Sequence, residues 1–222
     1  RAAIGTWIGF LDADDRWAPT FAARVRAACD ADDARAGHAG VRLIDEEGRP
    51  LGERLEGRGG RALIDLVTHR RPVFVSGGSG LLVERALLDE IGGFEETLST
   101  SADWDLYRRV AERTWLAWVA EPLVEYRLHG GQMHTNLERW ERDMQRALKR
   151  ALAGRGTDWT PALRREAWGR LYRQFAGARF REGSYGRCLA WAARALTAHP
   201  AEFAYFLGVL GRRRGPGAGG RV

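Results

Sequence analysis

Hydrophobic and polar positions divide this chain of 222 residues into a first part with strand-like and helix-like patterns and a later part with helix-like patterns alone. The first apolar run, residues 7–11, has no polar alternation, which is typical of a parallel strand buried on both faces. The residues after the second run, 45–48, predict the turn of a hairpin. Strands are predicted at residues 7–11, 41–44, 115–119 and 123–128, the last two separated by Glu121 and Pro122.

Apolar residues at helical spacing predict the remaining elements. Pro19 suits the first turn of a helix whose apolar side is formed by Phe21, Val25 and Cys29. Further helices are predicted at 63–67, at 85–91, from about 101, and at 137–153, 161–181, 185–198 and 201–211. We therefore expect an α/β fold with a mixed sheet over residues 1–135, an α-helical region over 136–214 and a flexible tail over 215–222.

Composition supports a folded protein with two functional regions. The hydrophobic fraction is 45% and there are nine tryptophans, which excludes a disordered chain. The net charge is −5 over residues 1–137 and +10 over residues 138–214. The basic helices are interpreted first as a solvated arginine face and second as a surface attracted to an anionic membrane. Nucleic-acid binding ranks last, because no nucleic-acid motif accompanies the charge.

The N-terminal residues and the apolar runs of the chain bear on the cellular location of the protein. No signal peptide is found at the start, and the apolar run 203–210 is too short to cross a bilayer. Cys29 and Cys188 lie far apart inside helical patterns and are interpreted as small core residues. We expect a cytoplasmic protein, with peripheral contact at the inner face of the membrane as the alternative.

Three carboxylates follow the first predicted strand: Asp12, Asp14 and Asp15. Ligands of open α/β folds bind at the carboxyl ends of strands, and carboxylates this close together repel one another. A divalent cation relieves that repulsion, and oxygen ligands of this kind suit Mg²⁺ or Mn²⁺ shared with substrate phosphates. The competing interpretation is a solvated acidic turn.

A glycine-rich loop, residues 76–80, interrupts a later apolar segment. It lacks the Gly-Lys-Ser/Thr ending of a P-loop, so a triphosphate cradle is not expected. Two interpretations stay open with equal weight: a tight crossing of the backbone, and a loop that lines the substrate site.

Three blocks in order resemble the inverting family 2 glycosyltransferases, which have a GT-A fold. The blocks cover about residues 1–135 and together make a strong signal. They are Phe10-Leu11-Asp12-Ala13-Asp14-Asp15 with Trp17 and Pro19; Gly92-Gly93-Phe94 with Ala102-Asp103-Trp104-Asp105-Leu106 and Arg109; and Glu121-Pro122-Leu123 with Tyr126-Arg127-Leu128-His129.

The resemblance implies roles for individual residues. Asp12 and Asp14, with Asp15 beside them, correspond to the family's Asp-x-Asp element, which binds the metal and the sugar-nucleotide diphosphate. Asp103 corresponds to the general base, although Ala102 precedes it where the family usually has an acid; its competing interpretation is a helix N-cap.

The last block supplies two further candidates. His129 is the candidate metal ligand, with His134 as runner-up and an ordinary strand-end histidine as the alternative. Arg127 is predicted either to contact the diphosphate or to pair with the acidic cluster.

The implied function is metal-dependent transfer of a sugar, with inversion, from a nucleoside-diphosphate sugar to a hydroxyl of a glycan or lipid-linked acceptor. The alternatives are a scaffold protein with a degenerate transferase domain and a GT-A-like nucleotidyltransferase. The family has a nucleotide-binding βαβ region before the Asp-x-Asp strand, whereas this chain begins at Arg1. We therefore expect a chain truncated at its N-terminus and nearly inactive when isolated.

The helical region carries a second, weaker resemblance. Phe175, Gly183, Tyr185, Ala195 and Pro200 fall at spacings similar to those of one tetratricopeptide-type helical hairpin. One such repeat does not make a stable solenoid, so it is expected to pack on the transferase domain or to bind a partner.

Overall fold

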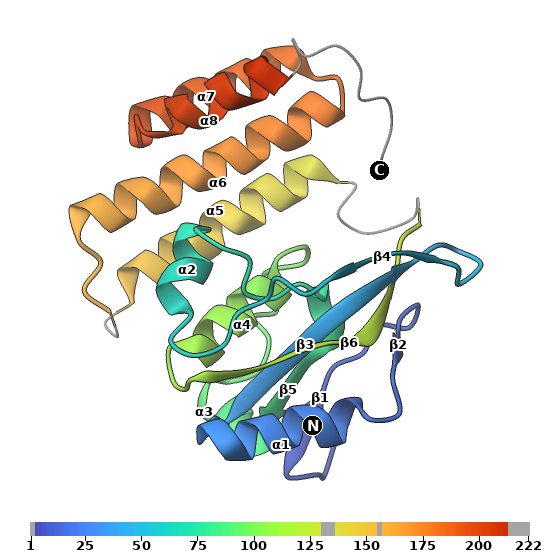
Figure 1. Ribbon diagram of the computed structural model, residues 1–222. Coiled ribbons are helices and arrows are strands. Elements are labelled where there is room, and N and C mark those ends of the chain that lie inside the picture. Colours follow the sequence, from blue (N-terminus) through green and yellow to red (C-terminus); the bar gives the residue numbers. More distant parts are fainter. Residues whose placement is uncertain (1–2, 130–135, 155–156, 213–222) are drawn as a thin grey trace. The chain divides into compact units, whose positions relative to one another are not determined.

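The computed structural model describes residues 3–129, 136–154 and 157–212 (Figure 1). The chain divides into two compact units, Arg1–Asp158 and Trp159–Val222. The predicted α/β class, with a mixed sheet followed by helices, is confirmed. The predicted tail, 215–222, lies outside the described residues.

The first unit is built on a six-stranded mixed sheet, with the strand order β1-β5-β3-β6-β2 and with β4 paired to β3. Only β3 and β6 pair in parallel; the other described pairs are antiparallel. The strands are β1 (Trp7–Gly9), β2 (Arg16–Trp17), β3 (Ala36–Ile44), β4 (Pro50–Arg54), β5 (Leu81–Glu84) and β6 (Leu116–Arg127). The hairpin predicted at 45–48 joins β3 to β4.

The first strand differs from the prediction of a parallel strand buried on both faces. β1 pairs only with β5 among the described residues, and the pairing is antiparallel. Trp7 and Ile8 are half-buried and Gly9 is exposed, because no described strand covers the other edge. The acidic residues still follow directly after this strand, so the error concerns the strand's neighbours and not the place of the turn.

The two strands predicted at 115–119 and 123–128 form one strand, β6. Glu121 and Pro122 lie inside it, where the pairing with β3 shifts register around Gly40. Proline is tolerated at a bulge because the strand needs no ladder donor there. A β-carbon on Gly40 would lie 2.8 Å from the carbonyl oxygen of Glu121, so this close crossing requires glycine.

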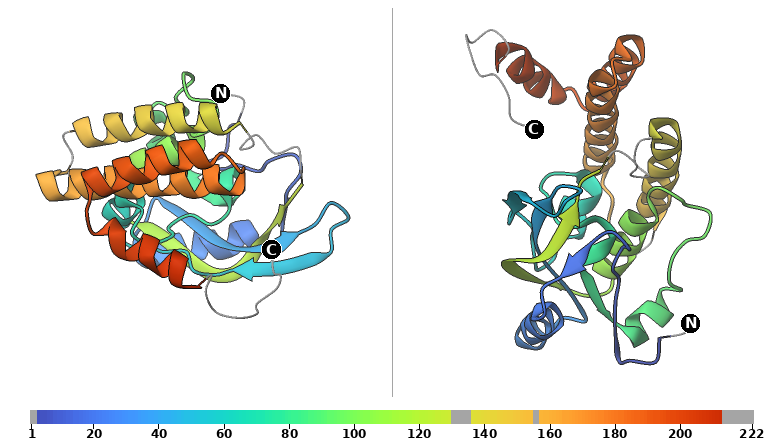
Figure 2. Two further views of the ribbon diagram at one scale, coloured as in Figure 1. Left: turned by 90° about the horizontal axis from the view of Figure 1, so that it is seen from above. Right: turned by 90° about the vertical axis from the view of Figure 1, so that its right-hand side faces the viewer.

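Helices cover both faces of the sheet (Figures 1 and 2). α1 (Phe21–Asp32) buries the predicted stripe of Phe21, Val25 and Cys29 against β3 and β6. A second core lies between the sheet and three helices. These are α2 (Leu63–Thr68), α3 (Arg85–Glu90) and α4 (Ala102–Ala111); the 3₁₀ turn η1 (Gly77–Gly80) precedes β5.

The helix α5 (Leu137–Ala153) has the predicted limits and belongs to the first compact unit. The buried carboxylate of Asp143 accepts hydrogen bonds from Ser99 and Thr100, and Arg150 pairs with Glu95 at 2.9 Å. These contacts tie α5 to the segment before α4. The division between the units therefore falls after residue 158 and not at the predicted boundary of 135 and 136.

The second unit is a helical hairpin followed by a third helix. α6 (Pro161–Arg181) begins with Pro161 after the Thr160 cap, and a short turn at Gly183 leads to α7 (Tyr185–Ala198). Trp191 of α7 stacks on Tyr172 of α6 at 5.3 Å between ring centroids. α8 (Glu202–Arg212) follows. Within the described part of the chain, no helix combines the length and apolar character that crossing a bilayer requires.

Candidate functional site

The three carboxylates after β1 form a tight turn in which they have different surroundings. The amide of Asp15 donates to the carbonyl of Asp12 at 3.2 Å, which closes the turn. Asp15 is buried, Asp14 is half-buried and Asp12 is exposed. The turn therefore presents two carboxylates to solvent and turns the third inward.

Ser79 of η1 stabilises the turn through hydrogen bonds. Its hydroxyl accepts from the amide of Asp12 at 3.0 Å and donates to Oδ2 of Asp15 at 2.5 Å. Its carbonyl accepts from the indole Nε1 of Trp17 at 2.6 Å. Burial raises the pKa of Asp15, against the lowering effect of the hydrogen bonds from Ser79 and Arg127. Asp15 is thus part of the support of the turn, and it does not line the cavity described below.

Arg127, at the end of β6, joins the turn to the sheet through hydrogen bonds. Its amide donates to Oδ1 of Asp15 at 2.8 Å, and its Nε donates to the carbonyl of Asp14 at 3.0 Å. Its Nη1 donates to the carbonyls of Asp45 and Glu46, in the β3–β4 turn. Of the two predicted roles, this geometry matches attachment to the acidic turn, and Arg127 is not among the residues that line the cavity.

His129 lies beside Asp14, just after the last strand of the sheet. Its Nε2 is 2.8 Å from Oδ2 of Asp14. That hydrogen bond lowers the pKa of Asp14, against the opposing effect of burial. The runner-up, His134, lies outside the described residues.

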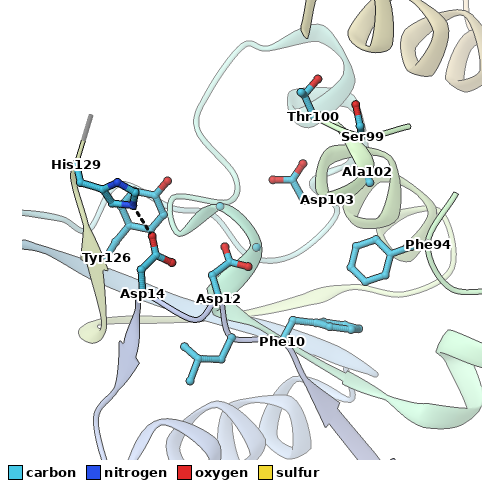
Figure 3. A pocket seen from close by; sticks show the side chains of 13 residues that line it. Phe10, Asp12, Asp14, Phe94, Ser99, Thr100, Ala102, Asp103, Tyr126 and His129 are labelled. Atoms are coloured by element: carbon cyan, nitrogen blue, oxygen red, sulfur yellow. Dashed lines mark hydrogen bonds and ion pairs between the residues drawn. The ribbon is translucent and has the colours of Figure 1, made fainter. Parts of the chain in front are cut away.

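A cavity of about 610 Å³ opens above the turn (Figure 3). The predicted residues Asp12, Asp14, Asp103 and His129 all line it, although they come from segments up to 117 positions apart. The full lining is Phe10, Leu11, Asp12, Asp14, Gly77, Gly78, Phe94, Ser99, Thr100, Ala102, Asp103, Tyr126 and His129.

Asp103 lies in the first turn of α4, across the cavity from the acidic turn (Figure 3). The N-cap position is Ser101, so the interpretation of Asp103 as the N-cap is wrong. Burial raises the pKa of Asp103; the amide of Trp104, 2.7 Å from Oδ1, acts in the opposite sense, and the charge of Asp12 raises it further. A carboxylate with a raised pKa is suited to taking up a proton.

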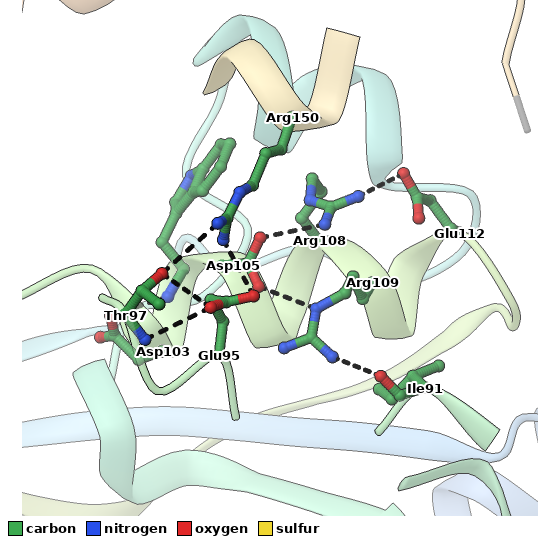
Figure 4. Close-up of polar contacts among 10 residues, drawn as sticks. Ile91, Glu95, Thr97, Asp103, Asp105, Arg108, Arg109, Glu112 and Arg150 are labelled. Atoms are coloured by element: carbon green, nitrogen blue, oxygen red, sulfur yellow. Dashed lines mark hydrogen bonds and ion pairs between the residues drawn. The ribbon is translucent and has the colours of Figure 1, made fainter. Parts of the chain in front are cut away.

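Charged side chains pair with one another along α4, and one of them joins the helix to the segment that precedes it (Figure 4). Asp105, 2% exposed, accepts from Arg108 at 3.0 Å and from Arg109 at 2.8 Å. Arg109 also donates to the carbonyl of Ile91 at 2.7 Å, just before the Gly92-Gly93 turn. The second block of the sequence resemblance therefore contains, besides Asp103, the arginine that links α4 to the Gly92-Gly93 turn.

Sequence reasoning missed several lining residues. Phe10 and Phe94 meet edge to face at 5.1 Å, and Tyr126 stands over Gly77. A β-carbon on Gly78 would lie 3.0 Å from Oδ2 of Asp12. The glycine-rich loop thus combines its two interpretations, because it crosses the acidic turn closely and also lines the cavity. Its glycines are the feature of the sequence that indicates this contact.

The donor set fits a divalent cation only in part. Among the described residues, no group of three or more His, Cys, Asp and Glu side chains is arranged to hold a metal. Mg²⁺ sites shared with phosphates use one or two carboxylates and complete their shell with phosphate oxygens and water. Asp12 and Asp14 fit that type of site. His129 lies beside them, with its Nε2 2.8 Å from Oδ2 of Asp14.

Comparison with known proteins identifies the fold. No protein-family model matches the chain, and no curated protein matches it by sequence. Crystal structures of S. aureus TarS, a glycosyltransferase, do match. One of TarS 1-349 has a TM-score of 0.52 at 12% identity, covering 93% of this chain and 68% of the other. Another, in complex with UDP, has a TM-score of 0.54 at 14% identity, covering 80% and 49%. The chain therefore has a glycosyltransferase-like fold and spans about half to two thirds of these neighbours.

The support of the acidic turn predicts a stability difference between neighbouring aspartates. Asp15→Ala leaves the Ser79 hydroxyl and the Arg127 amide without their acceptor, which we expect to cost about 2–3 kcal/mol of unfolding free energy. Asp14→Ala, a matched change on the half-buried side of the turn, should cost under about 1 kcal/mol. Urea unfolding of both variants measures this, and equal losses would contradict the role given to Asp15.

Proposed function

We propose that this protein transfers a sugar from a nucleoside-diphosphate sugar to an acceptor hydroxyl, with inversion at the anomeric carbon. The observation that carries the proposal is the meeting of Asp12, Asp14 and Asp103 around one cavity in a glycosyltransferase-like fold. The TarS neighbour in complex with UDP supports a nucleotide donor. The sequence blocks that resemble family 2 enzymes support the assignment of roles.

The donor's diphosphate is proposed to lie at the acidic turn. Asp12 and Asp14, with His129 as a third candidate, would hold Mg²⁺ or Mn²⁺ there. The cation supplies neutralisation of the charge that develops on the departing diphosphate. In this proposal Asp15 and Arg127 act through the turn, by fixing the positions of Asp12 and Asp14.

Asp103 is the proposed general base. As the acceptor oxygen forms its bond to the anomeric carbon, the bond from that carbon to the diphosphate oxygen breaks, and its electron pair leaves with the nucleoside diphosphate. The hydroxyl proton passes to the carboxylate of Asp103. The raised pKa of Asp103 makes the carboxylate a better proton acceptor, and the hydrogen bond from Arg109 to the carbonyl of Ile91 joins α4 to the segment that precedes it.

The rest of the cavity suits a carbohydrate acceptor. Phe10, Phe94 and Tyr126 offer aromatic surface to the apolar face of a sugar, and Ser99 and Thr100 offer hydroxyls. These features support a glycan or lipid-linked acceptor whose accepting hydroxyl lies next to Asp103.

Removing the base should abolish transfer without abolishing donor binding. In the full-length protein, Asp103→Asn is expected to lower kcat about 10²–10⁴-fold, because the amide cannot take the proton. Asp89→Asn, the same change at an exposed position of α3, is the matched control and should leave kcat unchanged. Release of nucleoside diphosphate with a panel of nucleotide sugars measures both, and release of pyrophosphate instead would indicate a nucleotidyltransferase.

The pH dependence of sugar transfer should follow the protonation of the Asp103 carboxylate. Its protonated form cannot accept a proton, so activity falls as the pH falls through its pKa. Because burial raises that pKa, we expect the acidic limb of kcat/KM to lie above the usual aspartate value of about 4. A limb at or below that value would contradict the assignment of Asp103.

The acidic turn should control donor binding in a metal-dependent way. Asp12→Asn and Asp14→Asn are each expected to weaken binding of the nucleoside diphosphate in Mn²⁺ by about tenfold or more, as loss of a contact to a charged group does. Chelation of the metal should remove the difference between the variants and the unmodified protein. Calorimetric titration measures the affinities; unchanged affinities, together with no turnover of any donor, would refute the proposed function.

A further inference from the structure

A second cavity, of about 330 Å³, lies beside the first and is strongly basic. Its lining is Thr97, Ser99, Arg139, Arg142, Asp143 and Arg146. Ser99 lines both cavities, so the two meet at the segment that leads into α4. We call this second space the arginine cavity.

The three arginines come from one face of α5. They are spaced by three and four residues, which aligns them along the helix, and they span about 10 Å of its length. All three are exposed. In the residues that the structure covers, no ion pair joins Arg139, Arg142 or Arg146 to a carboxylate, whereas Arg150 on the same helix pairs with Glu95.

Asp143 is the one acidic residue in the lining of this cavity, and its carboxylate is hydrogen-bonded to the segment before α4. Its Oδ2 accepts from the amide and hydroxyl of Ser99, both at 3.0 Å, and from those of Thr100, at 3.1 and 3.2 Å. Burial opposes ionisation, but these hydrogen bonds outweigh it and lower the pKa of Asp143. One carboxylate and three guanidinium groups leave a net positive charge facing the cavity.

We propose that the arginine cavity binds phosphate groups of the acceptor, an inference that rests on the proposed function. A guanidinium group can donate two parallel hydrogen bonds to two oxygens of one phosphate. Three arginines spread along two turns of a helix therefore suit more than one phosphate. In the proposed function, Asp12 and Asp14 would hold the cation and the donor's diphosphate on the far side of the first cavity. The acceptor would therefore be a glycan or lipid-linked molecule that carries phosphate groups near the hydroxyl delivered to Asp103.

An anionic membrane surface is the competing ligand, and α5 is poorly built for it. A helix that lies in a membrane interface presents apolar residues beside its basic face. The apolar residues of α5, including Met144, Ala147 and Leu148, are buried in the protein. The arginines are instead grouped around a concavity.

The test is calorimetric titration of the full-length protein with tripolyphosphate, in the absence of divalent cations and of donor. Arg142→Gln and Arg146→Gln are each expected to weaken binding about tenfold, since each removes a contact to a charged group. Arg165→Gln, the same change at an exposed position of α6, is the matched control and should leave the affinity unchanged. Equal weakening in all three variants indicates diffuse attraction and overturns the proposal.

Two further measurements separate the proposal from its alternatives. Binding of phosphatidylglycerol vesicles that depends on Arg142 and Arg146, without binding of tripolyphosphate, overturns it in favour of a membrane surface. With active protein, the same substitutions should raise KM for an acceptor glycan that carries a phosphate group and leave KM for the same glycan without phosphate unchanged; an equal effect on both overturns it.

The proposed function and this inference can fail separately. If tripolyphosphate binding depends on Arg142 and Arg146 but no nucleotide sugar is turned over, the proposed function fails and the anion site is supported. If sugar transfer occurs and tripolyphosphate binding is unchanged by both arginine substitutions, the proposal of an anion site in the arginine cavity is refuted and the proposed function stands.

Discussion

The arrangement of the site depends on one buried hydrogen-bonded link, between the hydroxyl of Ser79 and the carboxylate of Asp15. The same hydroxyl accepts from the amide of Asp12, while Asp15 accepts from the amide of Arg127. The link therefore joins the acidic turn, the glycine-rich loop and the end of β6, which are three separate stretches of the chain. A buried polar network of this kind favours one geometry because each unpaired member would be costly.

The link also explains how three neighbouring carboxylates coexist. Burial raises the pKa of Asp15, whereas the hydrogen bond from His129 lowers the pKa of Asp14. Neighbouring acids with different environments serve different roles. Asp15 supports the turn, and Asp12 and Asp14 line the cavity. Asp103, opposite them, has a raised pKa because of partial burial, with a further contribution from the charge of Asp12.

The sequence predicted the parts of this site better than their connections. α5 and α6 have the predicted limits because helical spacing and capping are local signals. The sequence predicts two strands on either side of Pro122, because the bulge that accepts a proline inside β6 depends on its neighbour β3. Only the family resemblance linked Asp12, Asp14, Asp103 and His129. The supporting role of Asp15 could not be predicted, because its partner Ser79 lies 64 positions away without a local pattern.

The charge division along the sequence acquires a different meaning in three dimensions. The net charge along the sequence changes sign near residue 138, yet α5 belongs to the first compact unit. That unit therefore contains an acidic turn and the arginine cavity, with Ser99 between the spaces they line. If donor and acceptor both carry phosphate, their mutual repulsion opposes binding in one site. In the proposed function, separate countercharges, a cation at the turn and arginines on α5, would neutralise each ligand where it binds. Because Asp143 fixes Ser99 and Thr100, the spacing between the two countercharges is set by the fold.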